Sequence, residues 1–567
     1  MHPIDHAIIG LYLVALLIAG FVLAKRAGSS ADDYFLGGRK LPWWALGASG
    51  MSSNLDVAGT MTIVTMITLY GLHGFWIEMR GGVVLPIAVF LAFMGKWHRR
   101  SGVMTTAEWM ELRFGSGPGG RIARLAAALT YVVITVAMIV FFLSAGGKFL
   151  AAFLPFTEMQ CSVAVALIAF GYTLVGGLYG VIWTDVVQAG LIGAAALYVS
   201  VKAYGLVTPE LLAGWHGAAL NQFLPMTGDP RLAPYEAFGW FLLVWLFKGV
   251  LEGLGGSGGS AYMAQRFYAA RSDADCTRIG LVWTLLFAAR WPMVLGFAIM
   301  AMHLGLEVRD AREAESVLPV VLASELFPVG VRGMMIAAML AAAMSTFDST
   351  INAGASYLVR DVFDVLRPQA SPRAQVWAGY AASALLVVAG LVLAFSLGAS
   401  VLGIWVGIVM LLFPAFLVPF ALRWFWARFT GAGFTAGIGG GFAGALAVWL
   451  LDPPGWNEAM RFLGIAGGSL LASLAGTWLS APVPDEVLRI FYARVRPFGL
   501  WPSAWRRDDR VEHRGDLARL VVALTWQVLT FLIPMGVLLR LWPSVLPAAV
   551  VWCAAGMWLL RPSRADA

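Results

Sequence analysis

Long apolar runs separated by short polar stretches extend through this chain. Most runs are about 20 residues long, the length that an α-helix needs to cross the hydrocarbon core of a bilayer. Hydropathy gives about fifteen such runs. They predict helices over residues 4–24, 42–71, 74–95, 122–152, 159–178, 180–204, 236–266, 279–304, 329–360, 375–396, 399–423, 431–451, 459–481, 517–539 and 541–560. The chain is therefore expected to be an all-α, polytopic membrane protein.

Two of the expected helices contain polar interruptions. The second contains GASGMSSNLDVAG at 47–59, and the seventh contains GVLEGLGGSGGS at 249–260. Glycine weakens a helix, and polar side chains such as those at 47–59 would not be left in lipid. Paired interruptions at corresponding positions are typical of inverted-repeat transporters that bind their substrate near the breaks. The alternative is tight packing of glycines between helices, which is more plausible at 249–260 than at 47–59.

The ninth run has the most polar centre. It reads AAAMSTFDSTINAGAS at 341–356, and Ser345, Asp348, Ser349 and Asn352 share one helical face, since positions three and four apart are neighbours. Such a row is costly against lipid, so it should face a cavity or an ion. Hydroxyl and carbonyl oxygens suit a hard cation. The alternative is that the hydroxyls join one membrane helix to another.

The composition agrees with a membrane protein. The chain has 567 residues, of which 60% are hydrophobic and 13% are charged, whereas soluble domains are roughly half apolar and about a quarter charged. The net charge of +7 does not indicate nucleic-acid binding, because the basic residues lie in short loops between the apolar runs. The three cysteines form neither a metal-binding spacing nor a disulfide framework.

Basic residues are concentrated in alternate loops. Roughly 28 of the 39 Lys and Arg residues fall on one side, which is cytoplasmic by the positive-inside rule. Arg266 and Arg423 are counted there as loop residues. This places the N-terminus outside and the C-terminus in the cytoplasm, with the protein in the inner, cytoplasmic membrane of the cell. The first run is followed by Lys25 and Arg26 rather than a cleavage site, so it is expected to be a membrane helix and not a signal peptide.

Three loops are expected to contain short helices. Residues 105–115 begin with a threonine cap, and residues 311–328 have a helical pattern. Residues 485–501, DEVLRIFYARVRPFGLW, are basic and aromatic. This composition favours a helix that lies on the cytoplasmic membrane surface.

Four motifs are more specific than hydropathy. They are YFLGGRKLPWW (34–44), TTAEWMELRFG (105–115), GGLYGVIWTDVVQ (176–188) and AAAMSTFDSTINAGASYLVRDVF (341–363). They resemble signatures of the sodium:solute symporter family, which includes the proline permease, the sodium/glucose cotransporters and sialic acid transporters. The resemblance implies a LeuT-like core of five-plus-five inverted repeats that works by alternating access. It divides the chain into an N-terminal helix and loop at 1–41, a first repeat at 42–204, an extracellular loop at 205–235, a second repeat at 236–425 and accessory helices at 426–567.

The resemblance also implies a sodium site. Its ligands would be the carbonyls of Ser52, Leu55 and Ala342 and the hydroxyls of Ser345 and Thr346. Na+ is then the coupling ion, and no organic cofactor is expected.

Some members of the family bind a second sodium ion near the aspartate of the WTD motif, which is Asp185 here. The matching positions on the ninth run are Ser345, Asp348 and Ser349, and at Asp348 a carboxylate replaces a family hydroxyl. Two carboxylates that approach one another in a low dielectric need a cation or a shared proton. The alternative is that Asp348 turns away and pairs with a donor such as Lys248 or a backbone amide.

The family places its solute beside the two breaks. The polar residues that this chain offers there are Asn54, Asp56, Glu78, Arg80, Glu252, Ser260, Tyr262 and Arg290. Trp76 and Tyr262 could cover an apolar or sugar face, and an arginine could hold a carboxylate. The alternative is a set of structural ion pairs, in which Arg80 pairs with Glu78 or Asp56 and Arg290 pairs with Glu252.

The sequence therefore predicts a sodium-coupled symporter that imports a small polar organic solute, such as a sugar, a sugar acid or another carboxylate. Its expected partners are the solute, sodium and the bilayer, with a monomeric transport unit and no nucleic acid. Proton coupling is the main alternative, because carboxylates occur at 56, 185, 252 and 348. A membrane sensor on the same fold would usually carry a cytoplasmic signalling domain. An intramembrane enzyme would need a paired catalytic set. Neither feature is evident in the sequence.

Overall fold

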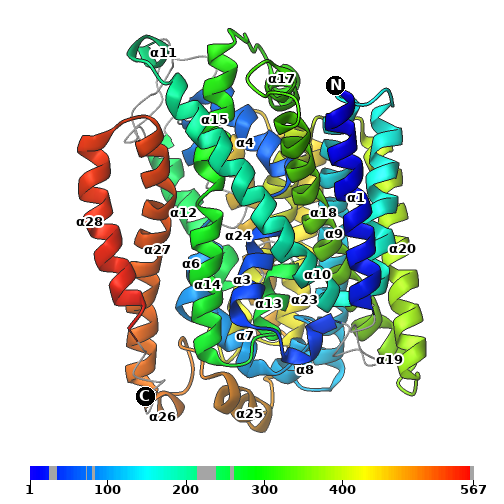
Figure 1. The fold of residues 1–567 in the computed structure, drawn as a ribbon. Coiled ribbons are helices and arrows are strands. Elements are labelled where there is room, and N and C mark those ends of the chain that lie inside the picture. The colour runs from blue at the N-terminus through cyan, green and yellow to red at the C-terminus, as the bar shows by residue number, and fades with distance from the viewer. Residues whose placement is uncertain are drawn as a thin grey trace.

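The computed structural model describes residues 1–24, 35–71, 73–78, 84–213, 238–255, 261–507 and 509–561. They form a bundle whose long helices run between the same two ends of the molecule (Figure 1). Within these residues, ten helices are long and apolar enough to cross a membrane. Within the described ranges the only β pairing is an isolated bridge between Trp426 and Leu500. The prediction of an all-α polytopic protein is confirmed, and the count of fifteen crossings stays a prediction.

The helices follow the expected apolar runs closely. Those of the first half are α1 (Pro3–Ala24), η1 (Gly37–Arg39), α3 (Trp43–Ser52), α4 (Val57–Tyr70), α5 (His73–Glu78), α6 (Pro86–Val89), η2 (Phe90–Met94), α7 (Gly95–Ser101), α8 (Trp109–Phe114), α9 (Pro118–Ala151), α10 (Glu158–Leu206) and α11 (Pro209–Ala213). The middle of the chain forms α12 (Phe238–Leu254), α13 (Ala261–Tyr268), α14 (Asp273–Phe287), α15 (Arg290–His303), α16 (Ala311–Glu315), α17 (Val317–Ala323), α18 (Val331–Leu358), η4 (Val359–Phe363), α19 (Asp364–Leu366) and α20 (Pro372–Leu397). The last part forms α21 (Val401–Gly407), η5 (Ile408–Leu412), α22 (Phe413–Phe425), α23 (Gly431–Leu451), α24 (Glu458–Trp478), α25 (Asp485–Val495), α26 (Ser503–Arg506), α27 (Arg510–Leu538) and α28 (Trp542–Leu559).

The fifth and sixth runs form one continuous helical element, α10, of 49 residues. At about 1.5 Å per residue it would be about 70 Å long, more than twice the thickness of a bilayer core. Its two apolar stretches, Glu158–Gly171 and Leu178–Leu206, correspond to the two expected runs. We therefore treat α10 as two legs that cross separately.

The second run is broken where its polar residues predict a break. α3 ends at Ser52 and α4 begins at Val57. The side chain of Asp56 caps α4, because its Oδ1 accepts a hydrogen bond from the Gly59 amide at 2.5 Å. A carboxylate is stabilised at this end of a helix by the free amides and the helix dipole.

The seventh run is also divided, since α12 ends at Leu254 and α13 begins at Ala261. The glycines in α12 have a packing role as well. A Cβ on Gly249 would lie 2.6 Å from the side chain of Leu85, and one on Gly253 would lie 2.6 Å from Val89. The alternative of tight glycine packing thus holds for these two positions in α12.

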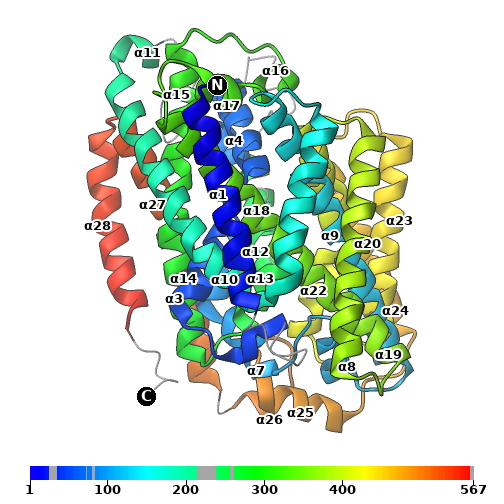
Figure 2. The same cartoon turned by 45° about the vertical axis from the view of Figure 1, so that its right-hand side comes forward.

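α18 lies in the middle of the bundle, behind α1 in Figure 2. It packs against α9, α10 and α1. In the most apolar 18-residue stretch of this span, 94% is buried inside the protein. The corresponding share for α28, at the edge of the molecule, is 11%. The polar row of the ninth run therefore faces protein and not lipid. Asp5 of α1 fixes the start of α18, because its Oδ1 accepts hydrogen bonds from the amides of Gly330 (2.8 Å) and Gly333 (3.0 Å).

α7, α8, α25 and α26 gather at one end of the bundle, which we call the basic end (Figures 1 and 2). Its ion pairs include Lys96 and Arg100 with Glu512, and Arg124 with Asp361. α1 begins at the opposite end and α28 ends near the basic end (Figure 1). This arrangement agrees with an odd number of crossings. Which end faces the cytoplasm stays a prediction.

The basic, aromatic segment at 485–501 does form a helix, α25, but most of its apolar face is covered by protein. Leu488, Phe491 and Val495 are buried, and α25 packs against α7 and α8. The rings of Phe491 and Trp109 lie 5.0 Å apart. The expectation of a helix lying on the membrane is therefore wrong for this face, because an amphipathic pattern does not distinguish lipid from the end of a helical bundle.

Candidate functional site

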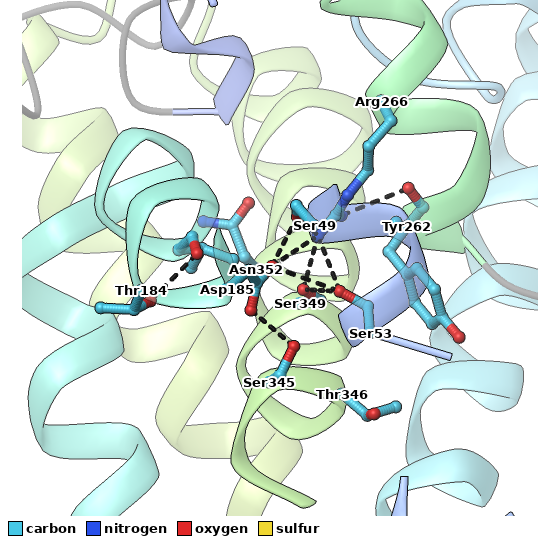
Figure 3. A network of polar contacts seen from close by, with 12 residues as sticks. Ser49, Ser53, Thr184, Asp185, Tyr262, Arg266, Ser345, Thr346, Ser349 and Asn352 are labelled. Atoms are coloured by element: carbon cyan, nitrogen blue, oxygen red, sulfur yellow. Dashed lines mark hydrogen bonds and ion pairs between the residues drawn. The ribbon is translucent and has the colours of Figure 1, made fainter. Parts of the chain in front are cut away.

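Three segments that are far apart in the sequence meet at the polar face of α18 (Figure 3). Ser345 Oγ donates a hydrogen bond to Asp185 Oδ1 of α10 at 2.5 Å. Ser349 Oγ lies 2.8 Å from the hydroxyl of Ser53, in the break between α3 and α4. The structure thus brings Ser345, Ser349 and Asp185 together beside the first break.

Arg266 of α13 lies within this group, and Figure 3 shows its side chain reaching toward the hydroxyls. Its Nη2 donates hydrogen bonds to Ser49 Oγ (2.9 Å), Ser53 Oγ (3.0 Å) and Ser349 Oγ (2.6 Å). The same nitrogen lies 3.5 Å from Asp185 Oδ2. Arg266 and Asp185 are both fully buried. A guanidinium therefore adjoins the carboxylate for which we expected a second cation.

The sequence offered a signal for Arg266 that we did not use. We assigned it to a loop because the seventh apolar run ends there. It lies four residues after Tyr262, which is one helical turn. Had Arg266 been treated as the last residue of that helix and not as a loop residue, it would have shared a face with the candidate solute residue Tyr262.

The surroundings of Asp185 explain how a carboxylate is buried here. Removing such a group from water is costly unless it is paired and hydrogen-bonded. Asp185 Oδ2 accepts a hydrogen bond from Ser49 Oγ at 2.5 Å, in addition to the contacts with Ser345 and Arg266. This guanidinium supplies the positive charge that was expected from a sodium ion or a shared proton.

Asp348 belongs to the same electrostatic neighbourhood. It interacts electrostatically with Arg266 and with Tyr12 of α1. The Tyr12 hydroxyl accepts a hydrogen bond from Gln188 Nε2 at 3.0 Å. Lys248, which we considered as a partner for Asp348, lies 3.6 Å from Glu252 on α12.

The predicted sodium ligands are oxygen atoms from the break and from α18. Thr346 Oγ1 donates to the carbonyl of Ala342 at 3.1 Å, so these two candidate ligands are adjacent. The carbonyl of Ser52 accepts from the Leu55 amide at 3.2 Å. The buried hydroxyl of Ser52 has no hydrogen-bond partner among the described residues. All five predicted ligands are oxygen atoms, and an oxygen-only set fits a hard monovalent cation.

A second polar group forms around Asn54 in the same break. The Tyr262 hydroxyl donates to Asn54 Oδ1 at 2.9 Å, and Arg290 Nη1 donates to the Asn54 carbonyl at 2.5 Å. Asp56 and Glu78 interact electrostatically with Arg290. All five residues are buried. The structure therefore brings five of the eight candidate solute residues into one neighbourhood.

Arg290 can lie this close to the break because residue 59 is glycine. A Cβ on Gly59 would lie 2.3 Å from Arg290 Nη2, so any larger residue would displace the guanidinium. The Nε of Arg290 is buried and has no hydrogen-bond partner among the described residues. One N–H of the guanidinium is thus available to a ligand.

Trp405 of α21 is a neighbour that the sequence did not indicate. Its Nε1 donates to Glu78 Oε1 at 3.0 Å. Its ring is stacked with Phe141 of α9, with centroids 5.2 Å apart. An apolar run gives no signal for a single functional tryptophan, because tryptophan is common in membrane helices.

Three candidate solute residues remain, namely Glu252, Arg80 and Ser260. Glu252 has Lys248 as its ion-pair partner, so the alternative in which it pairs with Arg290 is wrong. Arg80 and Ser260 lie outside the described residues, and their roles stay predictions.

Comparison with known proteins gives a consistent result. A sequence model of the sodium:solute symporter family matches residues 34–441. The sodium/sialic acid symporter SiaT of Proteus mirabilis is 24% identical over 402 residues, covering 68% of this chain and 76% of that protein. The sodium/glucose cotransporter of Vibrio parahaemolyticus is 23% identical over 482 residues, covering 77% and 83%. The sodium/proline symporter of Escherichia coli is 26% identical over 466 residues, covering 78% and 87%.

Among solved structures, a substrate-bound, outward-open sodium-coupled sialic acid symporter is similar in fold. Its TM-score is 0.67 at 21% identity, and the match covers 85% of this chain and 99% of that one. At this identity the likeness shows the fold alone.

Proposed function

Because the chain belongs to the sodium:solute symporter family, we propose that it is a sodium-coupled symporter that imports a small polar organic solute bearing a carboxylate. The observation that carries this proposal is the junction of α18 with the first break, where Ser349 and Ser53 are hydrogen-bonded at 2.8 Å. In a LeuT-like core of this kind, the site between the broken helices is exposed alternately to the two sides of the membrane. The basic end would face the cytoplasm by the positive-inside rule.

Sodium would bind the carbonyls of Ser52, Leu55 and Ala342 and the hydroxyls of Ser345 and Thr346. The buried hydroxyl of Ser52, which has no hydrogen-bond partner in the part of the chain that the structure describes, belongs to the same residue as one of these carbonyls and offers a further oxygen there. These ligands come from both α18 and the break, so the ion would stabilise the arrangement in which the two lie together. Five neutral oxygens suit an ion that must be released in every cycle.

The solute would bind the residues around Asn54. The Nε–H of Arg290, which has no hydrogen-bond partner among the residues that the structure describes, supports an anionic group, because an arginine fork binds a carboxylate through charge-assisted hydrogen bonds. One of the relatives named above, from Proteus mirabilis, is a sodium/sialic acid symporter. A sugar acid or a related carboxylate is therefore our first candidate for the solute.

The same geometry suggests how the two substrates are coupled. Arg290 is bonded to the carbonyl of Asn54, and the next carbonyl in the chain, that of Leu55, is a candidate sodium ligand. A solute that shifts Arg290 would shift the backbone of the break. Solute and ion would then favour one conformation of one short segment, which is a physical basis for reciprocal coupling.

A neutral sugar is the second candidate. Asp56 and Glu78 already compensate the charge of Arg290 electrostatically, and carboxylates accept hydrogen bonds from sugar hydroxyls. Competition between neutral sugars and their acid forms would separate the two. Stronger competition by neutral sugars, unchanged in Arg290→Gln, would remove the anionic option.

Arg266 would act as a fixed countercharge for Asp185. A second cation at Asp185, Asp348 and Ser349 would therefore require Arg266 to leave Asp185 and Ser349 first. Proton coupling through these carboxylates is the alternative to sodium coupling.

The purified protein in proteoliposomes, with imposed ion gradients and labelled solutes, tests the proposal. We expect uptake under an inward sodium gradient and none when choline replaces sodium. Equal uptake driven by a proton gradient without sodium would overturn sodium coupling. A panel of sugar acids, sugars and amino acids would identify the solute class.

A further inference from the structure

Arg423, near the end of α22, is a fully buried cation that neither the sodium site nor the solute site uses. Its guanidinium lies 4.4 Å from the ring centroid of Trp109, 4.7 Å from that of Phe420 and 5.2 Å from that of Trp424. Within the described part of the chain its hydrogen bonds go to main-chain carbonyls and to the sulfur of Met110. A buried charge held without a carboxylate is costly, so its contacts call for an explanation.

Those contacts join three segments. Nη2 donates to the carbonyl of Gly255 at 3.0 Å, Nε to that of Phe420 at 3.1 Å, and Nη1 to that of Thr106 at 3.4 Å. Gly255 directly follows α12, so it is the first residue of the second break. The end of a helix presents free carbonyls and the negative end of the helix dipole, and a guanidinium suits both. Arg423 therefore attaches the end of the broken helix to α22.

Arg113 of α8 has the same chemistry but different partners. It is also fully buried and lies 5.0 Å from the ring centroids of Phe114 and Trp501. It donates to the carbonyls of Arg423 (2.9 Å) and Trp426 (2.8 Å). These contacts join α8 to the end of α22 and do not involve α12. Arg113 is thus a matched control for Arg423.

We propose that Arg423 is a positioning residue that holds the second broken helix against α22 and so keeps the transport path closed toward the basic end. The inference rests on the proposed function, in which the basic end faces the cytoplasm. Alternating access requires the broken helices to move relative to the helices around them. The bond between Arg423 and Gly255 spans that boundary and has to break when the basic end opens.

Arg423→Lys tests this directly. Lysine keeps the charge, but a single ammonium does not reproduce the planar fork that reaches three carbonyls. The arrangement that is open toward the basic end should then gain population, so fewer molecules can accept substrates from outside. The half-saturating external concentrations of sodium and solute should both rise by the same factor, roughly tenfold. Exchange of solute across membranes with equal sodium on both sides should be little changed.

The control is Arg113→Lys, which removes the same fork from an equally buried arginine and should leave both half-saturating concentrations close to wild type. Measuring sodium-dependent uptake by the wild type distinguishes a failure of the proposed function from a failure of the role of Arg423. If the wild type shows none, the proposed function fails. If the wild type is sodium-dependent and the two lysine variants behave alike, the role of Arg423 is overturned.

Gly255→Ala provides a second route if Arg423→Lys does not accumulate as folded protein. The added Cβ would lie 3.3 Å from the Glu252 carbonyl, so the end of α12 would have to shift slightly, whereas its distance of 3.5 Å from Phe420 Cβ is an ordinary contact. Both half-saturating concentrations should rise together, by a smaller factor. Wild-type values for both would contradict the inference.

Discussion

Replacing Arg266 with glutamine removes the countercharge of a buried carboxylate. In the native protein its Nη2 contacts Asp185 and three hydroxyls, all of them fully buried. Removing one partner of a buried pair costs about 3–5 kcal/mol, because the remaining charge is left uncompensated. We therefore expect Arg266→Gln to be one of the more destabilising single changes in the core.

A second substitution tests the origin of that loss. In Arg266→Gln with Asp185→Asn, the carboxylate nearest to the lost guanidinium is neutral as well, so the double variant should recover about 2 kcal/mol or more relative to Arg266→Gln alone. The control is Arg278→Gln. The Arg278 side chain is 56% exposed, and such surface changes usually alter stability by about 0.5 kcal/mol or less.

The assay is thermal unfolding of the purified protein in detergent, with the four proteins compared at the same scan rate. A sodium titration adds a second readout. With the guanidinium gone, the oxygens of Asp185, Ser349 and Ser53 are open to a cation, so sodium should stabilise Arg266→Gln more than the wild type. A site filled at 100 times its dissociation constant would contribute about 2.7 kcal/mol. The reasoning is refuted if Arg266→Gln unfolds at the same temperature as the wild type. It is also refuted if adding Asp185→Asn makes Arg266→Gln less stable.

Three further predictions concern the ion and solute sites. Ser345→Ala and Thr346→Ala should each raise the sodium concentration for half-maximal transport with little loss of folded protein; unchanged sodium dependence in both would show that the ligands are elsewhere. Asp348→Ser should stay active and change the charge moved per solute or the pH profile, measured by electrophysiology on supported membranes; a variant unchanged in both would leave Asp348 without a role in coupling. Arg290→Gln should raise the half-saturating concentration of a carboxylate solute by roughly tenfold or more, since a charge-assisted bond is lost; equal binding of the acid and its neutral analogue by the wild type would argue against an anionic solute.

The sequence was sufficient for the parts of the fold that depend on local chemistry. Hydropathy located the apolar runs, because a membrane helix must be apolar over its whole length. The first break was predictable, since Asn54 and Asp56 are poorly placed in lipid and Asp56 caps the helix that follows. The shared face of Ser345 and Ser349 followed from helical periodicity, and its contact with Asp185 followed from the family resemblance.

The parts that the sequence did not reveal depend on tertiary packing. Arg266 and Arg423 follow or end apolar runs, so they were assigned to loops, yet both are fully buried. Their partners are hydroxyls and carbonyls on other helices, which no local pattern identifies. The pairing of Glu252 with Lys248, one turn earlier on the same helix, was available from helical spacing but was not preferred over Arg290.

The orientation of α25 is a further example. Its pattern has an apolar face and a basic face, and the same pattern suits either a lipid surface or the end of a bundle. Only the burial of Leu488 and Phe491 against α7 and α8 distinguishes the two.

Solute-driven entry of labelled sodium into proteoliposomes tests the central claim most directly. With no initial sodium gradient, an inward gradient of the transported solute should carry labelled sodium inward, and this flux should be lost in Ser345→Ala with Thr346→Ala. Solute uptake that carries no sodium, or a sodium flux that persists in the double variant, would contradict the account.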